Sequence, residues 1–252
     1  MGPPESTPGR EAHGPGGGGG GAAPTRAGPP NRRPRPAATP PTAPAHTPAP
    51  APAPAAPTLL GHTLVRLCEG QAEEGSTLFD ADRGEESYFR AIGGKTGALI
   101  DAACRTGALA AGLDAPTTRA LGRFGHHLGV GFQLLDDMLD LTASHASTGK
   151  PVGHDIANGV YTYPTLWALR RDPGLRRLLE EVARCDGPRT GPAGEAAHRV
   201  RASGALTATR LAIARRRERC LGILDEAVDG IGPDGVGLLA DLAIAVLSHR
   251  DG

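Results

Sequence analysis

This 252-residue sequence has no net charge, no long apolar run and few aromatic residues, and each of these shortages excludes a class of protein or fold. The formal net charge is zero, so charge gives no reason to expect a nucleic-acid partner. No continuous apolar run approaches the roughly 20 residues that cross a membrane. Aromatic residues make up only 3% of the chain, and no segment alternates apolar and polar residues as a half-buried strand does. We therefore predict an all-α fold.

Cysteine usage and the N-terminal residues bear on the cellular compartment. The four cysteines form no CxxC pair, so they fit reduced thiols better than a disulfide framework or a zinc site. No hydrophobic stretch near the N-terminus resembles a secretory signal. We expect a cytoplasmic protein.

Residues 1–57 differ sharply in composition from the rest of the chain. They hold 17 of the 24 prolines and a glycine run over 16–21, with almost no large apolar residue. Burial therefore cannot offset the entropy lost by ordering them. We predict a disordered tail over 1–57 with polyproline II character toward its end, and one helical domain over 58–252. A Pro-rich docking segment is the alternative interpretation of the tail.

Apolar periodicity and turn residues divide residues 58–252 into helices separated by loops. The predicted helices cover 58–75, a segment from 85 that breaks or bends at Gly93-Gly94, 95–112, 117–141, a helix with Pro164 in its first turn, 173–185, 195–224 with a weak point at Gly204, and 233–248. Loops are predicted over 141–148 and 186–194.

The helix predicted over 117–141 carries three carboxylates near its C-terminal end. Asp136 and Asp140 lie one turn apart on one face, Asp137 flanks them, and Gln133 lies one turn earlier. Like charges this close repel unless a cation lies between them, and Mg²⁺ takes carboxylate oxygens together with substrate phosphates. We interpret the stretch as a Mg²⁺–phosphate site. A solvated acidic helix face is the alternative. The apolar face of this helix is predicted from residues at helical spacing: Leu121, Phe124, Leu128, Phe132, Leu135 and Leu139.

The two lysines of the chain, Lys95 and Lys150, both lie beside glycine. An ammonium group on a flexible stem is a point-charge ligand for phosphate. Lys95 and Thr96 lie at the predicted start of a helix, where free N–H groups and the helix dipole favour an anion. A capping threonine with an exposed lysine is the alternative. Lys150 and Asp155 belong to a Gly-rich turn that we expect to fold back toward the carboxylates.

Taken together, these motifs resemble the second half of a trans-type polyprenyl diphosphate synthase, from about Leu60 to Leu247. The motifs that carry the resemblance are Tyr88 followed by Lys95-Thr96-Gly97-Ala98-Leu99, then Phe124-Gly125 followed by Gly129-Val130-Gly131-Phe132-Gln133-Leu134-Leu135-Asp136-Asp137-Met138-Leu139-Asp140, and then Gly149-Lys150-Pro151-Val152-Gly153-His154-Asp155 with Gly159 and Thr162-Tyr163-Pro164.

The resemblance implies a helical bundle of the isoprenoid-synthase type with a central cavity. In this family two Asp-rich motifs hold Mg²⁺, which binds an allylic diphosphate and assists its departure before isopentenyl diphosphate attacks. Asp136, Asp137 and Asp140 resemble the second motif, with Asp136 as the first candidate for a direct metal ligand. Lys95 and Thr96 resemble the pair that contacts the allylic diphosphate. The remaining implied roles are a polar residue at the reacting centre for Gln133, a cavity residue for Phe132 and a diphosphate-binding lysine for Lys150.

The sequence departs from the family pattern at two places. Val160 stands where the family usually has a further lysine, which removes one diphosphate contact. The first Asp-rich motif, expected upstream of Leu60, is not in the sequence, since residues 1–57 contain no aspartate. We therefore expect a bundle that lacks its N-terminal helices and leaves an apolar face exposed. A homodimer, or a heteromer with a chain that supplies the first motif, would complete such a site.

Three functions remain open at this point. The first is a Mg²⁺-dependent prenyltransferase that condenses isopentenyl diphosphate with an allylic diphosphate. The second is a truncated, non-catalytic or partner-dependent homologue that binds diphosphate and metal through a half-site. A terpene cyclase ranks last, because no downstream Asn/Ser/Glu metal motif follows Asp155.

Overall fold

The computed structural model describes residues 55–142 and 152–248, which all lie within one of two units of the chain, His46–Gly252. These residues form helices and contain no strand, so the all-α prediction is confirmed for them. The helices are α1 (Ala55–Ser76), α2 (Glu85–Ile92), η1 (Gly93–Gly97, a π-helix), α3 (Ala98–Ala110), α4 (Ala115–Thr142), α6 (His154–Ala157), α7 (Tyr163–Leu169), α8 (Pro173–Arg184), α9 (Thr190–Ala202) and α10 (Ala205–Leu247).

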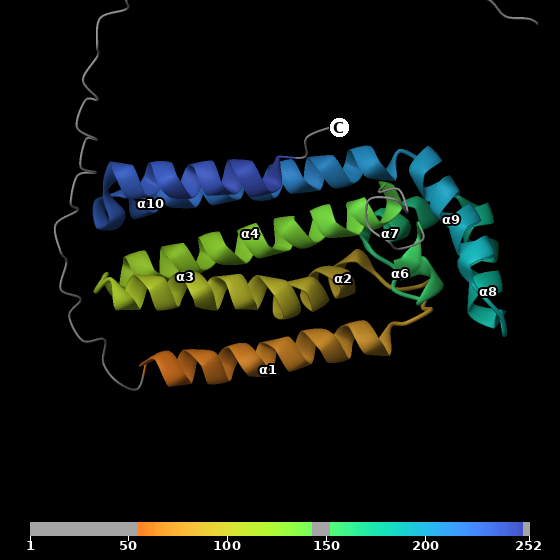
Figure 1. The fold of residues 1–252 in the computed structure, drawn as a ribbon, viewed down its shortest axis with the longest axis horizontal. Helices are drawn as coiled ribbons and strands as arrows, with labels where there is room; N and C mark the ends of the chain where they lie inside the picture. The colour runs from red at the N-terminus through yellow and green to blue at the C-terminus, as the bar shows by residue number, and fades with distance from the viewer. Residues whose placement is uncertain (1–54, 143–151, 249–252) are drawn as a thin grey trace, which may run out of the picture. The chain divides into compact units, whose positions relative to one another are not determined.

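The long helices lie side by side, and the short ones gather at one end (Figure 1). α4 is the central element, because it packs against α3 on one side and α10 on another. α1 packs against α2, η1 and α3, and α6, α8 and α9 form the cluster at the end where α4 finishes. The C-terminal end of α4, which carries the three aspartates, therefore meets the short helices.

Several predicted helix boundaries agree closely with the structure. The Asp-rich helix extends over Ala115–Thr142, and Pro164 lies in the first turn of α7. Three predictions are wrong. The single helix predicted over 195–224 is two helices, because Gly204 with φ 89° separates α9 from α10, and α10 continues beyond residue 224. The loop predicted over 186–194 ends early, because α9 already begins at Thr190. The expected break at Gly93-Gly94 does not occur, because α2 continues through η1 into α3.

The helix named α10 has two arms that reverse direction at Gly232, where φ is 70° and ψ is 168° (Figure 1). Only glycine adopts such a conformation easily, and Pro233 then begins the second arm. By length and composition α10 is apolar enough to cross a membrane. Its reversal and the arginines of its first arm, at 215–217, argue against a continuous span.

The buried face of α4 shifts along the helix. Leu121, Phe124 and Leu128 are buried as the periodicity predicts, but Phe132 is 49% exposed and Leu139 is 38% exposed. In that half of the helix the core is formed by Leu134, Met138 and Leu141 instead. The cause is that α3 and α10 flank α4, while the stripe between them is uncovered among the described residues.

Apolar side chains are also exposed on three other helices. They are Leu60, Leu64 and Val65 on α1, Leu99 on α3, and Leu211, Val228, Leu238, Leu242 and Ile244 on α10. The predicted exposure of apolar residues is thus present in the described part of the chain. The tail predicted over 1–57 falls almost entirely outside that part, and α1 begins at Ala55, just before the predicted domain boundary at 58.

Candidate diphosphate and metal site

The three predicted aspartates occupy the last turns of α4, in different surroundings. Asp136 is exposed, Asp140 is half-buried, and Asp137 is only 4% exposed. The carboxylates of Asp136 and Asp140 are therefore the two that a ligand reaches directly. Asp137 lies in the core beneath them.

Asp137 is held by hydrogen bonds that link it to other predicted site residues. It accepts a short hydrogen bond from the hydroxyl of Tyr88 and another from Gln133 Nε2 at 3.0 Å. The same Gln133 nitrogen donates to Asp136 Oδ2 at 3.4 Å, and Thr96 Oγ1 donates to Gln133 Oε1 at 2.9 Å. Burial raises the pKa of Asp137, while the bonds from Tyr88 and Gln133 oppose the shift. Thr96, Gln133 and two of the aspartates thus form one network.

Lys95 and Thr96 do not lie at a helix start, contrary to the prediction. In η1 the N–H of Ala98 donates to Gly93 O, five residues earlier, and the N–H of Gly93 is bonded within α2. The helix N-terminus that was expected to bind an anion is therefore absent.

The glycines around η1 serve close packing and do not end the helix. A Cβ atom on Gly94 would lie 2.7 Å from Arg66 O of α1, and one on Gly70 would lie 2.7 Å from Ala91 O and from Lys95 N. On the other side, a Cβ atom on Gly129 of α4 would lie 3.0 Å from Thr96 O. η1 is thus held between α1 and α4 by backbone contacts that only glycine permits, and these contacts position Lys95 and Thr96.

Lys95 is held by a carboxylate that the sequence analysis did not single out. Its Nζ lies 2.6 Å from Glu74 Oε1 at the C-terminal end of α1. Both side chains are partly buried, with exposed fractions of 35% and 18%. An ion pair in such surroundings is less screened than one on the surface. Glu74 therefore fixes the position of the ammonium group of Lys95.

A further carboxylate residue, Asp155 of α6, contacts the end of α4, as expected of the Gly-rich turn that carries it. Asp140 accepts hydrogen bonds at 3.3 Å from two backbone N–H groups, Gly153 N on its carbonyl and Asp155 N on Oδ2. Gly153 adopts φ 77°, a conformation that suits glycine. Burial raises the pKa of Asp155 to about 7, and the charges of Asp140, Asp137 and Asp136 add to the shift. Asp155 thus lies among the motif aspartates.

Sequence patterns did not predict the contacts of Tyr88 and Glu74. Tyr88 meets Asp137 across 49 residues of the chain, and Glu74 meets Lys95 across 21. Asp155 belongs to the turn that was expected to fold back toward the carboxylates, and its N–H group contacts Asp140. The predicted site residue Lys150 lies outside the described residues.

The donor set fits a divalent cation that is shared with a ligand. No group of three or more His, Cys, Asp or Glu side chains in the described part of the chain is arranged to hold a metal ion by itself. Asp136 and Asp140 nevertheless offer hard oxygen donors on one face, with Asp155 beside them. Mg²⁺ characteristically binds through one or two carboxylates, several waters and substrate phosphates. Such a cation suits this arrangement better than one that needs a closed cage of protein ligands.

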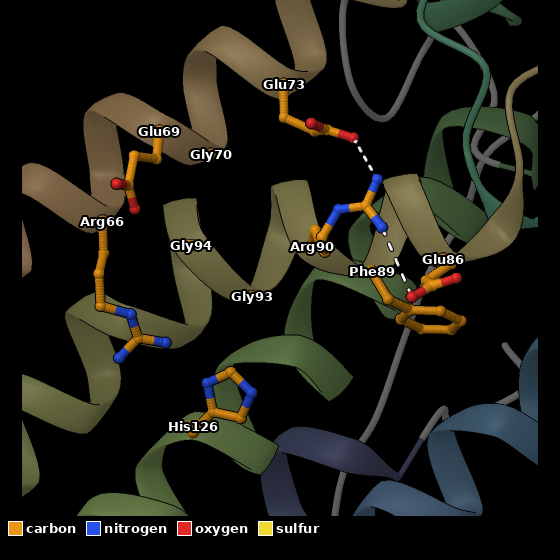
Figure 2. Close-up of a pocket in the computed structure, with 10 residues that line it drawn as sticks. All are labelled: Arg66, Glu69, Gly70, Glu73, Glu86, Phe89, Arg90, Gly93, Gly94 and His126. Carbon is orange, nitrogen blue, oxygen red and sulfur yellow. Dashed lines mark hydrogen bonds and ion pairs between the residues drawn. The ribbon is translucent and has the colours of Figure 1, made fainter.

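A separate cleft of about 520 Å³ lies between α1, α2 and α4 (Figure 2). Its charged groups pair with each other, since Arg90 reaches Glu73 at 2.9 Å and Glu86 at 3.6 Å. Arg66, on its wall, pairs with Asp101 at 3.2 Å. None of the predicted site residues lines this cleft. The cleft is therefore distinct from the carboxylate site.

Comparison with known proteins gives a consistent picture. Residues 46–195 match the family model described as polyprenyl synthetase. Over 190 residues the chain is 34% identical to heptaprenyl diphosphate synthase component 2 of Geobacillus stearothermophilus, a match covering 75% of this chain and 57% of that protein. The fold is similar to heptaprenyl diphosphate synthase from Staphylococcus aureus, with a TM-score of 0.71, 28% identity, and coverage of 77% of this chain and 59% of that one.

A second similar structure contains bound ligands. The polyprenyl synthase of Caulobacter crescentus CB15, solved in complex with calcium and isoprenyl diphosphate, matches with a TM-score of 0.68 and 28% identity, over 77% of this chain and 59% of that one. The chain thus spans less than two thirds of the length of each of these three proteins.

Proposed function

The chain belongs to the polyprenyl synthetase family, and from this premise we propose that its carboxylate site is the diphosphate-binding half of a prenyltransferase active site. The reaction is the condensation of an allylic diphosphate with isopentenyl diphosphate. The observation that carries the proposal is the network from Thr96 through Gln133 to Asp136 and Asp137, with the ammonium group of Lys95 on the residue next to Thr96. The network connects the hydroxyl of Thr96 to the carboxylates of Asp136 and Asp137, which are hard oxygen donors for a metal ion.

Each residue has a definite task in this site. Lys95 binds the diphosphate as a point charge, after exchanging Glu74 for a phosphate oxygen. Gln133, held by Thr96 and Asp137, keeps the carboxylate of Asp136 oriented. We propose Mg²⁺ as the cation of Asp136 and Asp140. When bound, it neutralises charge on the departing diphosphate.

The apolar residues beside the network suit a hydrocarbon chain. Phe132 is 49% exposed and lies one turn before Asp136, and Leu99 is 47% exposed and lies one turn after Lys95. Both therefore continue the polar site with an apolar surface, which favours a substrate with a charged head and an apolar tail. Covering this surface would also exclude water from the reacting carbon.

The opposite wall of the site must come from outside the described residues. The relative from Geobacillus stearothermophilus is named component 2, and this chain covers 57% of it. We propose that a second copy, a different chain or a segment upstream of the given sequence supplies the further Asp-rich motif. The runner-up is a half-site that binds diphosphate and metal without catalysis, favoured by the absence of a three-ligand metal group among the described residues.

The test is diphosphate binding by the full chain with and without Mg²⁺, measured by calorimetry with farnesyl diphosphate. Asp136→Asn removes a charged ligand and should weaken the Mg²⁺-dependent affinity at least tenfold, whereas Asp225→Asn, at an exposed position of α10, should leave it unchanged. Equal affinity of wild type and Asp136→Asn would show that the site is assigned wrongly.

A condensation assay separates the two candidate functions. The chain is supplied with labelled isopentenyl diphosphate and an allylic diphosphate, alone and with a candidate partner chain. Product supports the prenyltransferase, while Mg²⁺-dependent binding without product under either condition supports the non-catalytic half-site.

A further inference from the structure

Arg83 is a buried cation close to the carboxylate site, with no role in the function described so far. It lies in the connection between α1 and α2, and only 7% of the residue is exposed. Buried arginines are uncommon unless their charge is compensated. Burial lowers the pKa of Arg83, and the negative charges near it oppose the shift, with Glu74 first and Asp137 among them. The guanidinium group therefore lies within the electrostatic field of the site.

The hydrogen bonds of Arg83 reach two separate segments. Nη1 donates to the carbonyl of Tyr161 at 3.3 Å, and Nε donates to Ser87 Oγ at 3.4 Å. The guanidinium carbon also lies 5.8 Å from the ring centroid of Tyr88, within the range of a cation–π contact. Nη2 is buried and makes no hydrogen bond to the described residues. One side chain thus connects α2 to the turn that follows α6.

Both connected segments carry a part of the site. Tyr88 donates its hydroxyl hydrogen bond to Asp137, and the turn ending at Tyr161 begins directly after the helix that holds Asp155. A further bond from Phe79 N to Gly159 O, at 2.8 Å, ties the same two connections together. Arg83 therefore links the helix that carries Tyr88 to the turn next to the helix that carries Asp155.

We propose that Arg83 is a positioning residue of the diphosphate site, acting through Tyr88 and through the 158–162 turn, and this proposal rests on the proposed function. Arg83 contacts neither Asp136 nor Asp140 in the structure, so it acts on the ligand geometry and not as a ligand. Residues that orient metal ligands in this way typically change metal affinity or activity by about 10- to 100-fold when they are lost.

The experiment compares full-length wild type with Arg83→Met, Arg83→Lys and the control Arg176→Met. Arg176 binds the same connection, at Ala81 O and Asp82, but its side chain is 43% exposed, and it makes no contact with Tyr88 or Tyr161 among the described residues. The probe is inorganic diphosphate in the presence of Mg²⁺, and its affinity is measured by calorimetry. Arg83→Met should weaken binding about 10- to 100-fold, Arg83→Lys should fall between it and wild type, and Arg176→Met should bind like wild type.

Two further readouts keep the test decisive if Arg83→Met folds poorly. Arg83→Lys retains the buried charge but cannot reach Ser87 and Tyr161 together, so it should melt near wild type and still bind more weakly. Hydrogen exchange without ligand should rise over 153–163 in Arg83→Met while α10 stays protected, a pattern that general loss of stability does not produce.

The outcomes separate the two proposals. Wild type that binds diphosphate, together with folded Arg83 variants that bind equally well, would overturn the role of Arg83 and leave the proposed function intact. Loss of affinity in Arg176→Met as large as in Arg83→Met would also overturn it. Wild type that shows no Mg²⁺-dependent binding would overturn the proposed function and, with it, the role of Arg83.

Discussion

Replacing Gly70 with alanine tests the backbone contact that positions Lys95. The added Cβ would lie 2.7 Å from both Ala91 O and Lys95 N, whereas ordinary van der Waals contact begins near 3.4 Å. Since both neighbours are backbone atoms, α1 must move away from η1 by several tenths of an ångström. Overpacking of this kind costs about 1–3 kcal/mol in the free energy of unfolding.

The same substitution at Gly61 provides a control within the same helix. A Cβ atom there meets nothing within 4 Å, so only the helix propensity changes, and Gly61→Ala should stabilise the protein by about 0.5–1 kcal/mol. Urea unfolding followed by circular dichroism measures both variants. In a domain of this size each kcal/mol shifts the melting temperature by roughly 2–4 °C.

The two substitutions should therefore have opposite signs, and Gly70→Ala should also weaken Mg²⁺-dependent diphosphate binding because Lys95 is displaced. If Gly70→Ala raised the unfolding midpoint as Gly61→Ala does, α1 and η1 would not be in backbone contact. The account of how Lys95 is positioned would then be wrong.

Two further predictions concern stability. Tyr88→Phe removes the hydroxyl that donates to Asp137 and leaves a buried carboxylate with one hydrogen bond fewer. The free energy of unfolding in urea should therefore fall by about 1–3 kcal/mol. An unchanged value would contradict the hydrogen bond between Tyr88 and Asp137. Asp172 accepts hydrogen bonds from Arg199, which together with Gly174 N hold its pKa below the usual range. A lowered pKa stabilises the fold above the unfolded-state pKa, so the stability difference between wild type and Asp172→Asn should be full at neutral pH and vanish as pH falls through the folded pKa. If the stability difference between wild type and Asp172→Asn stayed constant down to acid pH, the pair of Asp172 and Arg199 would not be its source.

The bounds of α4 were predicted well because the apolar spacing that defines the helix lies within its own sequence. The apolar spacing and the acidic end gave 117–141, and the helix extends over Ala115–Thr142. The same spacing failed to predict which residues are buried beyond Leu128, because that depends on where α3 and α10 pack. Periodicity identifies an apolar face but not the neighbour that covers it.

The glycine pair before Lys95 shows the opposite case. Gly93-Gly94 is typical of a helix break, and the sequence alone supports that interpretation. In the structure both glycines are helical, and a Cβ atom on Gly94 would lie 2.7 Å from Arg66 O of α1, too close for any side chain. A glycine pair can mark either a helix break or a close approach of another helix. Only the position of the neighbouring helices shows which of the two applies. Thr96 and Gln133 were predicted as site residues from their motifs. Glu74, which holds Lys95, was not, because its role depends on how α1 packs against η1.

The π-helical segment determines in which directions Tyr88 and Lys95 point around the continuous helix formed by α2, η1 and α3. A π-helical turn accommodates one residue more than an α-helical turn, and each residue rotates the helix by about 100°. Tyr88 lies before η1 and meets Asp137, whereas Lys95 lies within it and meets Glu74. Deleting one glycine of η1 would leave a regular α-helix. The angle between the directions of Tyr88 and Lys95 would then change by about 100°. The extra residue of η1 therefore sets the angle between Tyr88, which contacts Asp137 on α4, and Lys95, which contacts Glu74 on α1.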